Sequence, residues 1–118
     1  MKDNNVILDK SFAFANRAVK LYKYLCSEQN ERVLSQQMLR SGTSIGANVR
    51  EAQRAQSRKD FIAKLSIALK ESYETEYWLE LLKENEYITQ AQFDSVFGDC
   101  RELTNILSQI VISSKSKV

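Results

Sequence analysis

The chain contains no proline, and its three glycines, Gly42, Gly46 and Gly98, all lie in its interior. Proline and glycine are the residues that most often end helices and form tight turns, so this chain has few sharp reversals. Leu, Ala, Lys and Glu are abundant, and all four favour helices. A chain of 118 residues with this pattern is expected to form one domain, spanning residues 1–118, built from a few long helices.

Apolar residues recur at intervals of three and four along four segments, which is the periodicity of helices that bury one face. The first helix is expected to begin near Asp9 or Ser11, either of which can cap it, and to end at the polar residues 27–30. The second is expected over about residues 31–55.

Two capping signatures mark the later helices. Ser57 followed by Asp60 predicts the start of a third helix that extends to about Asn85. Thr89 followed by Gln92 predicts the start of the fourth. Loose ends are expected at about residues 1–8 and 113–118. Four helices with short connections predict an all-α fold, an antiparallel up-down-up-down four-helix bundle.

Several classes of function are disfavoured by composition. Histidine is absent, which removes the commonest general base and metal ligand, and Cys26 and Cys100 are expected to be buried, reduced thiols. The carboxylates of the third helix lack the Glu-x-x-His pattern of di-metal bundles. We therefore expect no enzyme, cofactor or metal site. No apolar run is long enough for a membrane span and no signal peptide is visible, so a cytoplasmic protein without membrane contact is expected.

Small residues are concentrated in residues 39–52, LRSGTSIGANVREA, where a helix would normally carry bulk. Glycine within a helix costs about 1 kcal/mol relative to alanine, so Gly42 and Gly46 suggest that a neighbouring helix approaches closely. Asn48 falls on the apolar stripe of the same helix and needs hydrogen-bond partners if it is buried. We predict a buried polar lock formed by Asn48 with Ser44 and Glu51; Ser41, or a Tyr or Glu of the third helix, are alternative partners.

Charge is unevenly distributed although the net charge is only +2. Residues 40–64 contain six basic and two acidic residues, whereas residues 71–102 contain nine acidic and two basic ones. On one continuous helix the basic side chains of 40, 50 and 54 would project within a sector of about 80°. This pattern predicts a basic strip suited to phosphate contacts, and the alternative is a solvated face with local ion pairs. The strip consists of Arg40, Arg50, Arg54, Arg58 and Lys59.

The third helix is apolar on more than one side, which is more surface than three neighbouring helices can cover. We therefore expect a homo-oligomer with an interface on this helix. The predicted interface residues are Tyr73, Tyr77, Trp78 and Leu81.

The segments LRSGTSIGANVREA and DFIAKLSIALKESYETEYWLELL resemble a family of bacterial four-helix bundles. That family includes proteins encoded in intervening sequences of large-subunit ribosomal RNA genes and the accessory variability protein of diversity-generating retroelements. The resemblance implies a homopentameric ring and, for retroelement members, a basic surface that engages nucleic acid and a reverse transcriptase. The resemblance is carried by Leu39, Arg40, Ser44, Ile45, Ala47, Asn48 and Glu51.

Two functions remain open. The first is a non-enzymatic oligomer that binds RNA or DNA, or a nucleic-acid enzyme, through the basic strip. The second is a protein–protein scaffold whose acidic third and fourth helices contact the partner, with no nucleic-acid binding.

Overall fold

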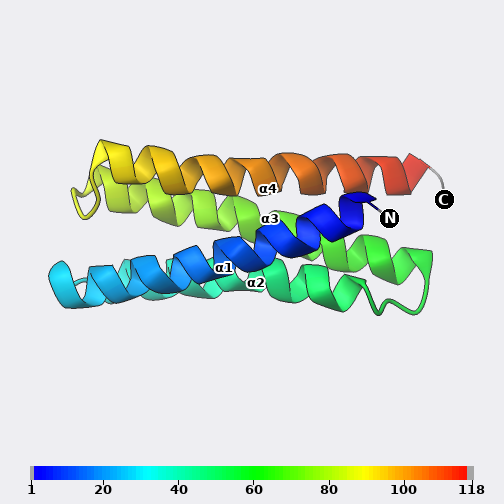
Figure 1. Cartoon of the computed structure of the whole chain (residues 1–118), viewed down its shortest axis with the longest axis horizontal. Helices are drawn as coiled ribbons and strands as arrows, with labels where there is room; N and C mark the ends of the chain where they lie inside the picture. Colours follow the sequence, from blue (N-terminus) through cyan, green and yellow to red (C-terminus); the bar gives the residue numbers. More distant parts are fainter. Residues whose placement is uncertain (1, 117–118) are drawn as a thin grey trace.

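The computed structural model describes residues 2–116, with side chains from residue 6 onward. Within these residues the protein is all-α, with four helices and no strand, as expected for a four-helix bundle. The helices lie side by side along the longest dimension of a body of 46 × 21 × 20 Å (Figure 1). The α1–α2 and α3–α4 connections lie at one end and the α2–α3 connection at the other (Figure 1). The helices are α1 (Lys2–Glu28), α2 (Val33–Ala52), α3 (Arg58–Glu84) and α4 (Gln90–Ser116).

Both predicted capping signatures are confirmed. The Ser57 hydroxyl accepts a hydrogen bond from the Asp60 backbone N–H at 3.0 Å, directly before α3. The Gln92 N–H donates to Thr89 Oγ1 at 3.1 Å, and the Thr89 N–H donates to Gln92 Oε1 at 2.8 Å. The single bond at Ser57 and the reciprocal pair at Thr89 and Gln92 satisfy N–H groups that the start of a helix leaves unpaired. They fix where α3 and α4 begin.

The predicted loose ends are wrong where the structure describes them. Helix α1 begins at Lys2 rather than near residue 9, and Ile7 is fully buried. Ser11 does not cap a helix, because it is itself buried and donates to the Leu8 carbonyl within α1. At the other end α4 continues to Ser116, so only residues 1, 117 and 118 of the predicted ends lie outside the described residues.

Helix α2 is shorter than predicted at both ends, running over Val33–Ala52 rather than about 31–55. The buried Glu31 stands before it and accepts backbone N–H bonds from Val33, Leu34 and Ser35 at 3.0, 2.9 and 2.7 Å. Burial by itself would raise the pKa of Glu31, but these hydrogen bonds outweigh it and lower the pKa. Glu31 therefore satisfies three donors of the first turn as a carboxylate.

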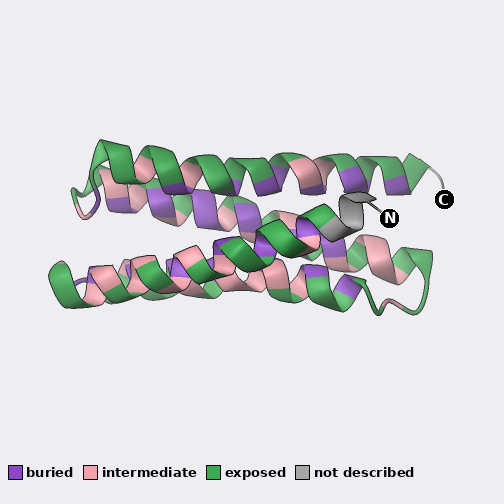
Figure 2. Cartoon of the chain, in the orientation of Figure 1, coloured by how far each residue is buried: buried purple, intermediate pink, exposed green. Residues whose placement is uncertain are grey.

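The expected close helix approach is confirmed and occurs between α1 and α2. A methyl group placed on Gly42 would lie 3.1 Å from Ala18 Cβ, and one placed on Gly46 would lie 3.2 Å from the Ser11 carbonyl oxygen. Any larger side chain at either position would push α1 away. Inward-facing residues of all four helices form one buried core (Figure 2).

The predicted polar lock around Asn48 does not form within the chain. Asn48 is half-buried and donates to the Ser44 backbone carbonyl, the Ser44 hydroxyl donates to the Arg40 carbonyl, and the exposed Glu51 pairs with Lys64. The buried face of α2 at this level is formed by Ile45 and Val49, which are both fully buried. At 100° per residue, Asn48 lies at the edge of that face and is therefore only half-buried.

The buried polar contacts lie instead on α3. Thr75 Oγ1 lies 2.9 Å from the Ser41 hydroxyl of α2. Thr104 Oγ1 of α4 lies 2.9 Å from the Ser72 hydroxyl and 2.7 Å from Glu76 Oε2. These contacts link α3 to both of its neighbours and satisfy polar groups that burial would otherwise leave unpaired.

Of the two cysteines, Cys100 is buried as expected and Cys26 is only half-buried; both are free thiols. Burial, with the nearby charge of Glu76, raises the pKa of Cys100 to about 12. This thiol is therefore protonated at neutral pH and is not a nucleophile.

Candidate functional site

Four of the five predicted basic-strip residues gather at the end of the molecule that holds the α2–α3 connection. Arg50 lies in the last turn of α2, Arg54 in the connection, and Arg58 and Lys59 at the start of α3. All four side chains are exposed, and none forms an ion pair with a carboxylate among the described side chains. We call these four residues the basic end.

Arg40 does not belong to this group. Its guanidinium pairs with Glu71 and Glu74 of α3, near the middle of α2. The predicted strip assumed a continuous α-helix to residue 55, but α2 ends at Ala52, and the Arg54 N–H donates to the Glu51 carbonyl instead of the Arg50 carbonyl. The sequence placed five basic residues along one helix face, whereas the structure collects four of them around a turn and pairs the fifth, Arg40, with carboxylates of α3.

The nearest carboxylate to the basic end along α2 is neutralised locally. Glu51 Oε1 lies 2.9 Å from Lys64 Nζ, and this hydrogen bond and charge raise the pKa of Lys64. Asp60 is half-buried, and its carboxylate accepts a hydrogen bond from the Gln56 backbone N–H at 3.3 Å. Positive charge therefore prevails on this surface.

Next to the basic end, a hollow of about 400 Å³ opens between α1 and α2. Its distinctive member is Phe12, whose side chain is 56% exposed. The Arg50 guanidinium carbon lies 5.4 Å from the centre of the Phe12 ring, a cation–π arrangement. Small residues on both helices leave the space open. The lining residues are Leu8, Phe12, Ala15, Thr43, Gly46, Ala47, Arg50 and Glu51. Sequence reasoning missed Phe12, which carried no basic or capping signal.

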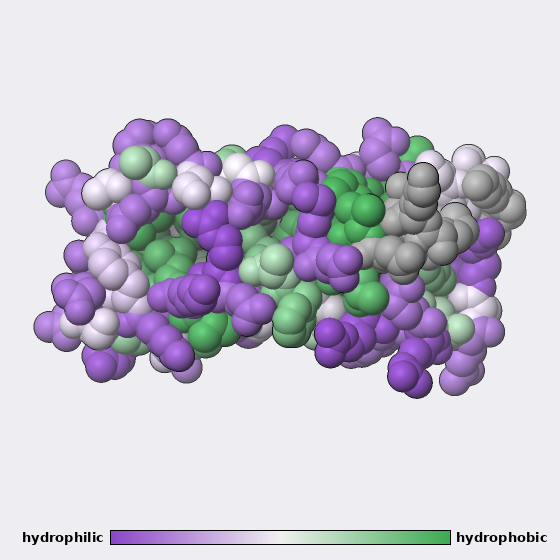
Figure 3. Space-filling model, viewed as in Figure 1, coloured by the Kyte–Doolittle hydropathy of each residue, from purple (hydrophilic) through white to green (hydrophobic). Residues whose placement is uncertain are grey.

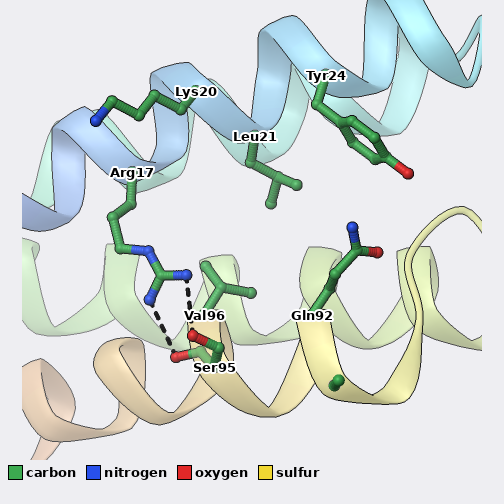
Figure 4. A pocket seen from close by; sticks show the side chains of 8 residues that line it. Arg17, Lys20, Leu21, Tyr24, Gln92, Ser95 and Val96 are labelled. Atoms are coloured by element: carbon green, nitrogen blue, oxygen red, sulfur yellow. Dashed lines mark hydrogen bonds between the residues drawn. The ribbon is translucent and has the colours of Figure 1, made fainter.

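A second hollow, about 580 Å³, lies between α1 and α4, the two least closely packed neighbours. Leu21 and Val96 point into it, and apolar residues are visible between these helices on the same face (Figures 3 and 4). Arg17 reaches across the opening and donates to the Ser95 backbone carbonyl and hydroxyl, at 3.2 and 3.1 Å (Figure 4). It also donates to the Asp99 carboxylate at 2.6 Å.

The predicted interface residues of α3 differ in exposure. Tyr73 and Tyr77 are 51% and 56% exposed, whereas Trp78 and Leu81 are half-buried. Trp78 packs edge-on against Tyr77, with ring centres 5.1 Å apart, and its indole N–H donates to Glu74 at 2.9 Å. Two adjacent exposed tyrosines on one helix are surface that a second subunit can cover.

Among the described side chains there is no group of three or more residues able to hold a metal ion. None of the four helices, over the part of each that the structure describes, is long and apolar enough to cross a membrane.

The helices and their connections define a class of small all-α proteins built on four packed helices. The chain belongs to the 23S rRNA-intervening sequence protein family, whose model matches residues 3–109. This match confirms the resemblance to proteins encoded in ribosomal RNA intervening sequences.

One similar solved structure is a crystal structure at 1.70 Å of a protein of unknown function from Bacteroides thetaiotaomicron VPI-5482, assigned to the S23 ribosomal protein family. It is 60% identical, covers 92% of this chain and 97% of its own, and superposes with a TM-score of 0.91. No curated protein matches the chain.

Proposed function

We propose that the chain is a non-enzymatic subunit of a homo-oligomer that binds nucleic acid through the basic end. The subunit is an antiparallel up-down-up-down four-helix bundle, and its family resemblance favours a pentameric ring. The observation that carries the proposal is the exposure of Arg50, Arg54, Arg58 and Lys59 without an ion-pair partner among the described side chains. Arginine and lysine in such a setting are free to contact phosphates.

Assembly strengthens this surface, because each copy repeats the same four cations. A ring would place several basic ends around one axis and raise the local positive potential well above that of one subunit. The exposed tyrosines of α3 support the assembly, since surface of this kind is typical of interfaces.

The proposal is tested by fluorescence anisotropy with short labelled RNA and DNA at salt concentrations from about 50 to 200 mM. Binding is expected to weaken with salt, with a log–log slope of about −3 per subunit if four phosphates of a single strand are neutralised. The double variant Arg54→Glu/Arg58→Glu should abolish binding. The control Lys23→Glu/Lys70→Glu makes the same charge change at two other exposed positions and should retain most of it. Equal loss in both double variants, or no binding by the unmodified protein, would refute the proposal.

A second candidate is a protein scaffold that uses the acidic end. Glu80, Glu84 and Glu86 are exposed near the α3–α4 connection, and only Glu84 pairs with a cation, Lys83, among the described side chains. Glu80→Lys/Glu86→Lys discriminates the two functions. An unaffected nucleic-acid affinity supports the first, whereas a salt-sensitive oligomer with no nucleic-acid affinity supports the second.

A further inference from the structure

The hollow beside the basic end supplies what a phosphate-binding surface alone lacks, an exposed aromatic ring. Phe12 is more than half exposed although it lies within α1, and the residues around it are too small to cover it. Of the five phenylalanines Phe12 alone is exposed, since the other four are buried or half-buried, so its ring is accessible to a ligand.

The ring and the cations form one continuous surface. Arg50 belongs to both, because it lines the hollow, lies over the Phe12 ring and is the first residue of the basic end. Arg54 follows four residues later, in the connection, and Arg58 and Lys59 stand at the start of α3. A nucleic-acid strand whose phosphates contact these cations therefore passes the mouth of the hollow.

Duplexes and single strands would use this surface differently. In a duplex the bases are paired and stacked inside, so an aromatic side chain on the protein has no base face to meet. In a single strand a base can turn outward and stack on an aromatic ring or a guanidinium plane. The hollow offers both groups, Phe12 and Arg50, and its volume of about 400 Å³ falls in the range of small-ligand pockets.

We infer that the preferred ligand is single-stranded nucleic acid, with one unstacked base held against Phe12 and Arg50 while the basic end contacts the adjoining phosphates. This inference rests on the proposed function and specifies its substrate class. Stacking on a phenyl ring does not distinguish ribose from deoxyribose, so single-stranded RNA and DNA are both included.

The test compares affinities for single-stranded RNA, single-stranded DNA and the corresponding duplexes at about 50 mM salt. Phe12→Leu keeps an apolar side chain but removes the ring, whereas Phe12→Tyr keeps the ring. Phe12→Leu is expected to weaken single-strand binding by about 5- to 150-fold, the range measured for loss of one base–aromatic stack, and to leave duplex binding unchanged. Phe12→Tyr should retain single-strand affinity. Ile112→Leu, at another exposed apolar position, is the matched control.

The outcomes separate this inference from the proposed function. Loss of binding in Arg54→Glu/Arg58→Glu but not in Phe12→Leu overturns the single-strand inference and leaves the proposed function standing. A Phe12→Leu protein that weakens single strands and duplexes equally, or that changes oligomeric mass in light scattering, assigns Phe12 to a subunit contact and also overturns it. Absence of any nucleic-acid binding by the unmodified protein would overturn both the single-strand inference and the proposed function. Comparable loss of affinity for single-stranded RNA and single-stranded DNA in Phe12→Leu is expected, because the stack involves the base and not the sugar.

Discussion

Helix α1 has a close neighbour on one side and a distant one on the other. Against α2, a methyl group on Gly42 would lie 3.1 Å from Ala18 Cβ, so a side chain there would force the helices apart, although the hollow of about 400 Å³ opens beside Gly46. Against α4, a hollow of about 580 Å³ remains, and the two helices are bridged by exposed ion pairs at Arg17–Asp99 and Lys10–Glu102. The size of the residues at each contact, rather than the helices themselves, therefore sets how closely neighbouring helices pack.

The largest expected effect comes from adding bulk to the close side. Gly42→Val should lower the free energy of unfolding by about 3 kcal/mol, because overpacking forces α1 away from α2. Gly42→Ala should cost less, since alanine regains about 1 kcal/mol of helix propensity. Denaturant unfolding measures both.

Gly98 provides the matched control, because a methyl group there would meet nothing within 4 Å. Gly98→Ala should raise the free energy of unfolding by about 0.5–1 kcal/mol. A Gly42→Val protein as stable as the unmodified one would show that α1 and α2 can move apart at little cost. The α1–α2 and α1–α4 contacts would then not differ in their tolerance of added bulk.

The next effect concerns the connection that closes the α1–α2 side. Glu31→Ala removes the acceptor for three backbone N–H groups and should lower the free energy of unfolding by about 1–2 kcal/mol at pH 7. The folded-state pKa of Glu31 lies below its usual value of 4.5, so its contribution is present above that value and is lost as pH falls through the lower, folded-state pKa.

Glu31→Gln isolates the titration, because the amide keeps one acceptor oxygen and carries no charge. Its free energy of unfolding should lie below that of the unmodified protein at pH 7, and the two should converge as pH falls from 4.5 through the lower, folded-state pKa of Glu31. A difference that stays constant with pH would mean that the carboxylate charge does not contribute to the cap.

A smaller effect is expected from the bridge on the open side. Arg17→Ala removes an ion pair whose side chains are 40% and 51% exposed, so the expected loss is only about 0.2–1 kcal/mol and should shrink at high salt. Lys23→Ala, an exposed residue without an ion pair among the described side chains, is the reference. A loss above about 2 kcal/mol would show that this bridge, and not the core, holds α4 against α1.

The smallest effect is expected from adding bulk to the open side. Ala91→Leu extends an exposed residue that lines the hollow. The free energy of unfolding, measured by thermal denaturation, should change by less than about 0.5 kcal/mol, or rise slightly as apolar area is buried. A loss similar to that of Gly42→Val would contradict the difference between the two sides of α1.

The sequence predicted the helices well where capping signals were unambiguous. Ser57 and Thr89 mark the true starts of α3 and α4. Ser11 was misread, because a serine that fits beneath a glycine of a neighbouring helix looks the same in sequence as a serine that caps. Only the three-dimensional structure distinguishes them, because it places Gly46 where an added methyl group would lie 3.2 Å from the Ser11 carbonyl oxygen. The polar start of α1 concealed the buried Ile7 for a similar reason.

The candidate site was predicted in composition but not in shape. Arg40 lies ten residues before Arg50 on α2 and pairs with Glu71 and Glu74 of α3, partners that periodicity within one helix does not reveal. The end of α2 decides only where Arg54 lies, and helix ends are the least certain part of any such prediction. The buried polar contacts were visible in principle, since Ser72 and Thr104 both fall on apolar stripes. Their pairing joins residues 32 positions apart, and periodicity within one helix carries no information about such partners.

The loose contact between α1 and α4 has a consequence for how the chain folds. The close α1–α2 contact joins helices that follow one another, so the entropy lost in closing the connection is small. The α1–α4 contact joins the first and last helices, and it is the least closely packed. Most of the tight packing can therefore form between chain neighbours before the two ends meet. Such a distribution of contacts favours rapid folding, with docking of α4 onto α1 as a late step.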